Sequence, residues 1–476
     1  MEHPLAAPLH TLACDRHAAS APALTHVRLD GKVEKLRFGE VAVASRALAQ
    51  KMQEAGVMPG ARVVVCLPQG TLAPVAHLAI SRAGAVSVPL SPLYGPDALA
   101  PRLAAARPAL AIVDAQKADA FAEAMPSLTL WRAQGGTLKV TRGPLESAAP
   151  PAWSRDAMSL FFTSGTTAAP KGVALPARVV PGRMPGFLRA HAAPGVFWSP
   201  ADWSWIGGLH DALFAPWLAG VPVFAYERSG PFDPERAGAL LREHGVESAF
   251  VPPTALKAWR RSGATPPKLR SLHTAGEALP GPVRAWAQDA FGGSAAEVYG
   301  LTECAFLTVD GEATPGIRLR QDDEGELLVA EGAPTMMLGY AHGDAIELPL
   351  RDGWLATGDV AVQDGERYRV MGRIDDVIKT SGYRVSPGEI EACLLHHPAI
   401  AECAVIGEPD EARGQAIVAF VKLAIPVEAA DLQAYVRDRL ALHLVPRRIV
   451  LVDELPTTIT GKILRRNLRG RRDDAP

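Results

Sequence analysis

The sequence predicts an α/β fold in which layers of short parallel strands alternate with helices, and two observations predict it. Short apolar runs rich in β-branched residues recur between longer amphipathic stretches, which is the pattern of buried strands and covering helices. Pro- and Gly-rich joints such as 91–96 separate these stretches and predict turns. The chain of 476 residues is too long for one ordinary domain and long enough to bury a large core.

The first part of the chain shows this alternation clearly. An amphipathic helix is predicted for 38–56, where a glycine ends it, and a short β-branched strand for 62–67. A second helix is predicted for 72–83, and further buried strands are predicted for 86–90 and 110–113. Strand and helix in alternation favour parallel sheets covered by helices.

Composition excludes several classes of protein. The 49 Lys and Arg residues nearly balance the 51 Asp and Glu residues, so no overall field attracts nucleic acid or an anionic membrane. The five cysteines are scattered without the spacing of a metal site, and their odd number fits a reducing, cytoplasmic location. No signal peptide is visible, because acidic residues occur within the first residues. The most apolar long region, 195–226, contains charged residues and prolines, so no membrane span is expected.

The stretch 160–172 carries the strongest indication of chemistry. An apolar run at 160–162 predicts the end of a buried strand, and Pro170-Lys171-Gly172 closes the stretch. Between them stand five small or hydroxylated residues: Thr163, Ser164, Gly165, Thr166 and Thr167. Small side chains allow backbone N–H groups to converge on a phosphate, and Lys171 adds a positive charge. The alternative is an ordinary Ser/Thr/Gly surface turn.

Aromatic residues gather between 195 and 226, and the sequence leaves their role open. The members are Phe197, Trp198, Trp203, Trp205, Phe214, Trp217 and Phe224. They fit plain core packing or the wall of a ligand pocket about equally well. Gly207 and Gly208, beside Trp205, would leave room for an apolar ligand to approach the backbone. Farther on, 249–253 and 272–279 predict a strand end and a strand that runs into a turn.

Four later segments carry charged residues after glycine turns. Glu303 follows a tight turn in 297–303, and one carboxylate together with ATP phosphates is a common way to hold Mg²⁺. Asp359 is the last residue of 353–359, and its carboxylate suits acceptance of hydrogen bonds from ribose hydroxyls. The alternatives are a solvated surface charge for Glu303 and an Asx-turn for Asp359. The segment 372–391 fits a solvated linker, and Lys462 fits one more charge in a basic tail.

In order along the chain, these segments resemble the motifs of the adenylate-forming enzymes. The motifs are the phosphate loop, the aromatic-plus-Thr-Glu motif, the Thr-Gly-Asp motif, the Gly-Arg-x-Asp-Asp hinge motif and the terminal Gly-Lys motif. This superfamily includes acyl- and aryl-CoA synthetases, the adenylation domains of peptide synthetases and firefly luciferase. The resemblance covers essentially the whole chain. The segments 203–208 and 302–304 look most like bacterial AMP-forming acyl-CoA synthetases.

The resemblance implies an AMP-forming acyl-CoA ligase, a cytoplasmic enzyme of fatty acid metabolism. A carboxylic acid would react with Mg-ATP to give acyl-adenylate and pyrophosphate, and the thiol of CoA would then displace AMP. A second hypothesis is an enzyme that transfers the acyl group to a separate carrier protein, and the sequence does not separate the two. A third is a trimmed nucleotide-binding relative without thioester activity, against which the presence of both Lys462 and Glu303 argues.

The resemblance also implies a domain organisation. A large N-terminal domain of layered α/β subdomains would occupy 1–373, and a small, mobile α+β C-terminal domain would occupy 377–476. The segment 374–376 would be the hinge between them, with Asp375 as the residue that changes conformation.

Site residues follow from the same resemblance. Thr163, Ser164, Gly165, Thr166, Thr167 and Lys171 would hold the β- and γ-phosphates, while Gly276, Glu277, Ala278 and Tyr299 would border the adenine. Asp359 would accept from the ribose hydroxyls near Arg373. Glu303 would bind Mg²⁺ beside Thr302, and Lys462 would bridge the carboxylate and the α-phosphate. Gly382 and Arg384 would line the path of the CoA thiol, and Trp205, Gly207 and Gly300 would line the acyl pocket.

Two departures from the family pattern bear on these expectations. Ala168 stands where the family loop usually has glycine, and Pro176-Ala177 replaces a Thr-His pair. Acetate-specific relatives carry a tryptophan at the position of Gly300, where it closes the floor of the acyl pocket. The resemblance therefore implies an open floor, acids larger than acetate, and a shift toward acetate in a Gly300→Trp variant.

Overall fold

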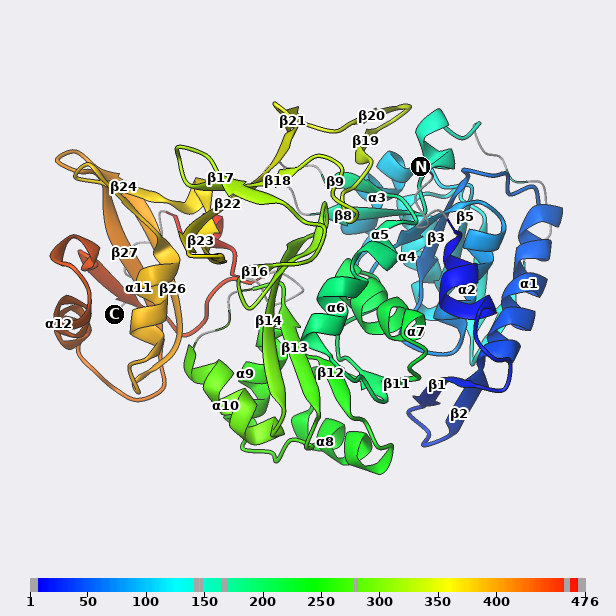
Figure 1. Cartoon of the computed structure of the whole chain (residues 1–476), viewed down its shortest axis with the longest axis horizontal. Helices are drawn as coiled ribbons and strands as arrows, with labels where there is room; N and C mark the ends of the chain where they lie inside the picture. The colour runs from blue at the N-terminus through cyan, green and yellow to red at the C-terminus, as the bar shows by residue number, and fades with distance from the viewer. Residues whose placement is uncertain are drawn as a thin grey trace. The chain divides into compact units, whose positions relative to one another are not determined.

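The chain divides into two compact units in the computed structural model (Figure 1). The structure describes residues 7–140, 145, 149–163, 170–277, 279, 281–457 and 463–469. The first unit comprises Met1–Gly276, Ala287–Arg318 and Ala330–Leu355, and the second comprises Glu277–Trp286, Leu319–Val329 and Ala356–Pro476. The predicted α/β class, with a large N-terminal and a smaller C-terminal part, is confirmed.

One sheet of the first unit has the strand order β20-β19-β9-β8-β4-β3-β5-β6-β7. Its centre, from β8 to β6, is parallel, and β9 and β19 extend it with antiparallel pairs. The strands are β3 (Arg62–Cys66), β4 (Val86–Pro89), β5 (Leu110–Asp114), β6 (Leu130–Gln134), β7 (Thr137–Lys139), β8 (Ser159–Thr163), β9 (Lys171–Leu175), β19 (Gly339–His342) and β20 (Ala345–Glu347). The helices in this part of the chain are α1 (Phe38–Glu54), α2 (Leu72–Arg82), α3 (Pro96–Ala106) and α4 (Ala118–Ala124).

A second sheet of this unit runs in the order β16-β15-β14-β13-β12-β10-β11-β1-β2. The strands from β14 to β1 are parallel to one another, as buried strands alternating with helices require. The strands are β1 (Pro22–Val27), β2 (Val33–Arg37), β10 (Phe197–Trp198), β11 (Val223–Tyr226), β12 (Ser248–Phe250), β13 (Ser271–Ala275), β14 (Ser294–Leu301), β15 (Ala305–Val309) and β16 (Glu312–Ala313). The helices are α5 (Val179–Gly182), α6 (Met184–Ala190), α7 (Ala215–Leu218), α8 (Pro234–Glu243) and α9 (Pro253–Ser262), and α10 spans Gly281–Phe291.

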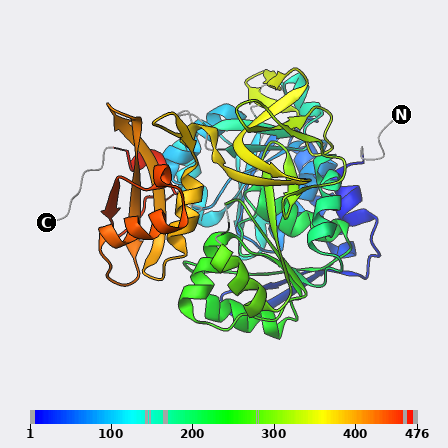
Figure 2. The ribbon, with the colours of Figure 1, turned by 60° about the vertical axis from the view of Figure 1, so that its left-hand side comes forward.

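The second unit contains a sheet in the order β25-β24-β27-β26, with β28 parallel to β27. Alternate residues of its long strands face opposite sides, so that Val405 and Val421 pack with α11 and α12, while Ile406 and Phe420 pack with Leu468. The ribbon of this sheet and its helices is coloured orange to red in Figure 2. The elements are β24 (Ile378–Thr380), β25 (Tyr383–Val385), α11 (Pro387–Leu395), β26 (Ile400–Asp410), β27 (Gly414–Leu423), α12 (Ala429–Arg439) and β28 (Arg448–Leu451). Strands β17 (Leu319–Gln321), β18 (Glu326–Ala330), β22 (Trp354–Asp364) and β23 (Arg367–Arg373) are neighbours in that order.

The elements predicted from periodicity are confirmed to within a few residues. The helix predicted for 38–56 is α1, that for 72–83 is α2, and the strands predicted for 62–67, 86–90 and 110–113 are β3, β4 and β5. The linker interpretation of 372–391 is wrong. That segment contains the end of β23, a 3₁₀ turn at Ile374–Asp376, both strands of the β24–β25 hairpin and the start of α11. The hinge at 374–376 remains a prediction about motion.

Most of the aromatic cluster is core. Trp198, Trp217 and Phe224 are almost fully buried, as are Phe197, Trp203 and Phe214. Trp205 is the exception, because its side chain is only partly buried. The question that the sequence left open therefore has two answers, with six members in the core and Trp205 left as the candidate for a pocket wall.

Candidate functional site

The ends of two paired strands enclose the predicted phosphate loop. Thr163 is the last residue of β8 and Lys171 the first of β9, and the two are opposite each other in the antiparallel register. Both are half-buried. Ser164, Gly165, Thr166 and Thr167 lie outside the described residues. The pairing of β8 with β9 nevertheless places both ends of the loop at one edge of the sheet.

A single tyrosine contacts both predicted phosphate-site charges of the first unit (Lys171 and Glu303). Its phenolic hydroxyl, on Tyr340 of β19, donates to Glu303 Oε1 at 3.0 Å. Lys171 Nζ lies over the Tyr340 ring at 5.3 Å from the centroid, within the range of a cation–π interaction. No sequence motif indicated Tyr340, because only the pairing of β19 with β9 brings it near Lys171. In that pairing Tyr340 is opposite Val173.

The turn that carries Glu303 is shaped by a close backbone approach. Thr302 and Glu303 lie in the turn between β14 and β15, and the Glu303 carbonyl accepts from Met337 N at 2.8 Å. A β-bulge falls between Tyr299 and Gly300, and a Cβ on Gly300 would collide with the carbonyl oxygen of Ala305. The backbone therefore requires glycine at 300 whatever the shape of the acyl pocket. Gly300→Trp would displace the turn that holds Glu303, so this variant does not report on the pocket alone.

Two of the predicted adenine residues lie at the carboxyl ends of adjacent parallel strands. Gly276 follows β13 and Tyr299 lies near the end of β14, where Ala275 is opposite Val298. Gly276 has φ +97°, which favours glycine, and Glu277 follows it, half-buried. Ala278 lies outside the described residues. Ligands of open α/β sheets bind beyond the carboxyl ends of the strands, so this placement suits a nucleotide base.

Trp205 lies near the same strand ends. With Gly207 and Phe250 it forms a small apolar cluster, which we call the apolar corner. A Cβ on Gly276 would lie 3.9 Å from Trp205 Cζ3, and Trp205 meets Phe250 edge to face at 6.4 Å between ring centroids. A Cβ on Gly207 would lie 3.0 Å from Phe250 Cε1. Phe250 ends β12 and stacks on His273 at 4.7 Å. Sequence reasoning missed Phe250, because a phenylalanine in a short buried strand has no feature that separates it from core.

In the second unit, the predicted ribose-binding carboxylate lies against its predicted arginine. Asp359 of β22 is opposite Arg373 of β23, and Arg373 Nη1 donates to Asp359 Oδ1 at 3.3 Å and to the Thr357 carbonyl at 3.0 Å. Gly358 has φ +73°, and a Cβ there would collide with the Arg373 guanidinium. Asp359 lies within a strand, so the Asx-turn interpretation is wrong. The carboxylate is held by a cation and could still accept from a hydroxyl group.

The predicted hinge and thiol-path residues all lie in the second unit. Asp375 is exposed in the 3₁₀ turn after β23. Gly382 has φ +82° in the turn between β24 and β25, and a Cβ there would meet nothing within 4 Å. Arg384 follows in β25, where its backbone is opposite Lys379.

The predicted catalytic lysine, Lys462, lies outside the described residues, but its surroundings in sequence are anchored. Thr457 and Ile463, on either side of it, form an antiparallel bridge. Arg465 donates to both oxygens of Glu391 at 2.9 Å and lies 3.4 Å from Asp376. Arg465, which follows Lys462 by three positions, is therefore held in an ion-pair network.

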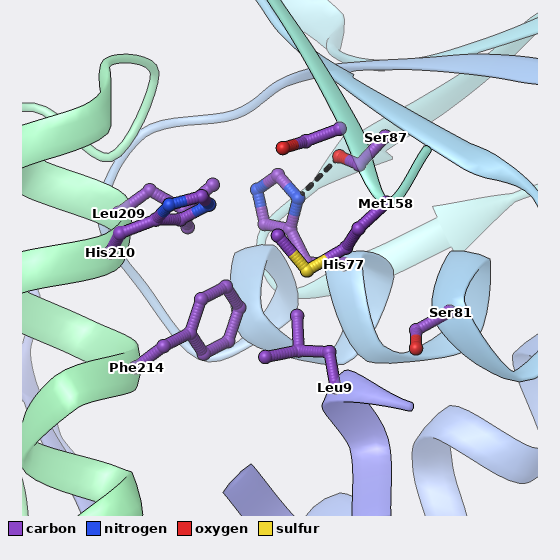
Figure 3. Close-up of a pocket in the computed structure, with 9 residues that line it drawn as sticks. Leu9, His77, Ser81, Ser87, Met158, Leu209, His210 and Phe214 are labelled. Carbon is purple, nitrogen blue, oxygen red and sulfur yellow. Dashed lines mark hydrogen bonds between the residues drawn. The ribbon is translucent and has the colours of Figure 1, made fainter. Parts of the chain in front are cut away.

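The first unit also has a small cavity, which differs in its lining residues and in its size from the sites described above. It is lined by Leu9, His77, Ser81, Ser87, Met158, Ser159, Leu209, His210 and Phe214 (Figure 3). His77 Nδ1 and Ser87 Oγ are 2.7 Å apart, and burial lowers the pKa of His77 to about 3. Its volume of about 10 Å³ leaves room for one water molecule and excludes an acyl chain.

Magnesium fits the donor set at Glu303 only in part. In the described residues, no three side chains that could ligate a metal converge on one point. Glu303 alone, with one oxygen engaged by Tyr340, could supply one carboxylate ligand to Mg²⁺, with phosphate oxygens and water supplying the rest. None of the helices in the described part of the chain is long and apolar enough to cross a membrane.

The chain is similar to known proteins over most of its length. Residues 13–340 match the AMP-binding enzyme family, and residues 389–462 match the C-terminal domain of AMP-binding enzymes. The chain is 32% identical to 4-hydroxybutyrate–CoA ligase 1 of Metallosphaera sedula over 93% of its own length and 86% of that protein. It is 33% identical to acetyl-coenzyme A synthetase of Bacillus subtilis, although this match spans 66% of the chain and 61% of the relative. The crystal structure of an acyl-CoA synthetase from Brucella canis superposes with a TM-score of 0.71 at 28% identity, covering 97% of this chain and 94% of that one.

Proposed function

Because the chain belongs to the AMP-binding enzyme family, we propose that it is an AMP-forming acyl-CoA ligase that uses the residues described above. In the first step a carboxylate oxygen attacks the α-phosphorus of ATP, and the bond to the β-phosphate oxygen breaks to release pyrophosphate. In the second step the sulfur of CoA attacks the acyl carbon, the bond to AMP breaks, and the thiol proton goes to solvent. Each step exchanges one bond for another, so no oxidant or reductant is needed.

The observation that carries this proposal is the convergence of charges around Tyr340. Lys171 supplies a mobile ammonium at the end of the phosphate loop, and Glu303 supplies a carboxylate fixed by a hydrogen bond. Bound Mg²⁺ would neutralise phosphate charge and polarise the phosphoryl oxygens. Preorganised cations and donors of this kind contribute roughly 3–4 kcal/mol each to phosphoryl or acyl transfer. Lys462 would bridge the attacking carboxylate and the α-phosphate.

The residues proposed to hold the nucleoside are those that the resemblance implies. Gly276 and Tyr299, at the ends of β13 and β14, would border the adenine, because a glycine with φ +97° leaves the base free to approach the backbone. Asp359, held by Arg373, would accept from the ribose hydroxyls. Asp375 would be the hinge, and Gly382 and Arg384 would line the thiol path, as the resemblance implies.

For the acid, we propose a substrate larger than acetate that ends near Trp205, Gly207 and Phe250. These residues form an apolar corner at the strand ends, and apolar burial favours longer chains by about 0.8 kcal/mol per methylene. A ligase named for 4-hydroxybutyrate among the relatives agrees with such a size, whereas the acetyl-coenzyme A synthetases argue for a smaller acid. CoA is the proposed acceptor, and the five unpaired cysteines agree with a cytoplasmic location.

The test is release of AMP from ATP across a panel of carboxylic acids from acetate to octanoate. We expect release that requires both an acid and CoA, with a maximum above acetate. Omission of CoA should leave pyrophosphate exchange intact, because acyl-adenylate formation precedes the thiol step. Release that requires a carrier protein in place of CoA would overturn the acceptor, and a maximum at acetate would overturn the acid.

A further inference from the structure

Tyr340 lies between the two charges that the proposed function assigns to the phosphates. Its hydroxyl donates to Glu303 Oε1 at 3.0 Å, and its ring faces Lys171 Nζ at 5.3 Å. Within the described residues, Lys171 and Glu303 make no ion pair with each other. Each charge is therefore held by the same neutral side chain and is not neutralised by the other.

The backbone around Tyr340 is fixed on both sides. Strand β19 pairs with β9, where Tyr340 is opposite Val173, and with β20, where it is opposite Glu347. Gly339 allows the close approach of β20, because a Cβ there would lie 2.5 Å from the Glu347 carbonyl oxygen. A tyrosine whose main chain is held by two neighbours can place its hydroxyl reproducibly.

The segment that leads into Tyr340 also holds the main chain of Glu303. Met337 N donates to the Glu303 carbonyl at 2.8 Å, and Leu338 N donates to the Ala174 carbonyl at 2.8 Å. Glu303 is thus fixed at its backbone and at its carboxylate by residues only three positions apart. Ala174 follows Lys171 in β9, so the same segment anchors the strand that begins with Lys171.

We infer that Tyr340 is a positioning residue that holds Lys171 and Glu303 as separate charges for the phosphates and the cation of Mg-ATP. The inference rests on the proposed function, because it takes the nucleotide as the ligand of both charges. The hydroxyl fixes the Glu303 carboxylate so that its other oxygen can ligate the cation. The ring attracts the Lys171 ammonium through its face without neutralising it, so that the ammonium keeps its charge for a phosphate.

The two functions of the side chain can be separated by substitution. Tyr340→Phe keeps the ring and removes the hydroxyl, whereas Tyr340→Leu removes both. A matched control is Tyr368→Phe, because Tyr368 donates its hydroxyl to the Leu319 carbonyl in the second unit, among residues with no assigned role. Binding of ATP and of AMP, with Mg²⁺ and with EDTA, is measured by isothermal titration calorimetry.

We expect Tyr340→Phe to weaken binding of Mg-ATP about tenfold, the usual effect of losing a hydrogen bond to a charged group. With EDTA the loss should be under about threefold, because Glu303 acts through the cation. Tyr340→Leu should weaken ATP binding a further ~3-fold under both conditions, because Lys171 acts on the phosphates directly. AMP binding should change little in either variant. In a Glu303→Gln background, Tyr340→Phe should have no additional effect on Mg-ATP.

The outcomes separate this inference from the proposed function. Wild-type protein that binds no ATP would overturn the proposed function. If the wild type binds, Tyr340→Phe with unchanged Mg-ATP affinity, or with equal losses for ATP and AMP, would overturn the positioning role alone. Tyr368→Phe should match the wild type, and a loss there equal to that of Tyr340→Phe would also count against the inference.

Discussion

Replacing Asp359 with alanine should weaken nucleotide binding while leaving the fold nearly unchanged. The Asp359 side chain is 9% exposed and its partner Arg373 is 44% exposed, with 3.3 Å between the charged atoms. Loss of the carboxylate does not leave Arg373 as a buried unpaired charge, because its Nη1 still donates to the Thr357 carbonyl at 3.0 Å and its remaining donors can reach water. A partly exposed ion pair contributes at most about 1 kcal/mol to stability.

Nucleotide binding should respond more strongly. A hydrogen bond from a ribose hydroxyl to a carboxylate is worth about 1.5–3 kcal/mol, so losing one weakens ATP binding at least ~10-fold and losing two about 100-fold or more. Calorimetry with ATP, 2′-deoxy-ATP and 3′-deoxy-ATP measures this effect. The wild type should prefer ATP over the deoxy analogue whose missing hydroxyl contacts Asp359, and Asp359→Ala should bind the three ligands about equally.

The matched control is Asp364→Ala, because Asp364 is an exposed carboxylate on the same strand, β22. Its nucleotide affinity and its midpoint of urea unfolding should equal those of the wild type. Asp359→Ala that still discriminates against the deoxy analogues would refute the ribose assignment. A loss of several kcal/mol in unfolding free energy, without loss of discrimination, would show that Asp359 is structural.

Three further predictions address the chemistry, the acyl pocket and the pH dependence. Lys462→Ala should abolish acyl-adenylate formation but retain most thioester formation from supplied acyl-adenylate, and equal losses in the two half-reactions would contradict its role. Gly207→Val should narrow the corner against Phe250 and lower the hexanoate-to-acetate ratio of kcat/KM several-fold; an unchanged ratio would remove Gly207 from the pocket. Burial lowers the pKa of His191 to about 3, so the folded state disfavours the charged imidazole. The contribution of neutral His191 to the free energy of unfolding is therefore present above pH ~6.5 and should fall by about 2 kcal/mol between pH 6.5 and 5. Urea unfolding at each pH should show that His191→Asn has a smaller slope than the wild type.

The sequence predicted the local elements and the motif residues because both depend on neighbours along the chain. Periodicity was sufficient for α1, α2 and the strands β3 to β5, since each buries one face or both faces of a short segment. The resemblance implied that Asp359 lies near Arg373, and the register of β22 and β23 brings the two together. Long-range pairing was beyond this reasoning. Tyr340 meets Glu303 across 37 positions only because β19 joins β9.

The aromatic cluster shows a second limit. Hydrophobicity and size are the same for a core tryptophan and a tryptophan in a pocket wall, so the sequence could not divide the seven residues. Burial divides them, because Trp198 and Trp217 have no exposed surface while Trp205 remains partly open. Phe250 escaped attention for the converse reason, since it is 1% exposed and still forms one side of the corner near Gly207.

Gly300 illustrates why the size of a pocket is harder to infer from a related protein than the position of a charged residue. The resemblance takes glycine at 300 as the absence of the tryptophan that closes the acyl pocket in acetate-specific relatives. Here the bulge at Tyr299 and Gly300 brings the Ala305 carbonyl onto the place of a Cβ, so any side chain first requires a different turn. That turn carries Glu303, the proposed ligand of Mg²⁺, so a change in its shape would also move the proposed metal ligand. Acid size is therefore better tested at Gly207, where the nearest neighbour is the Phe250 side chain, than at Gly300, where the nearest neighbour is backbone.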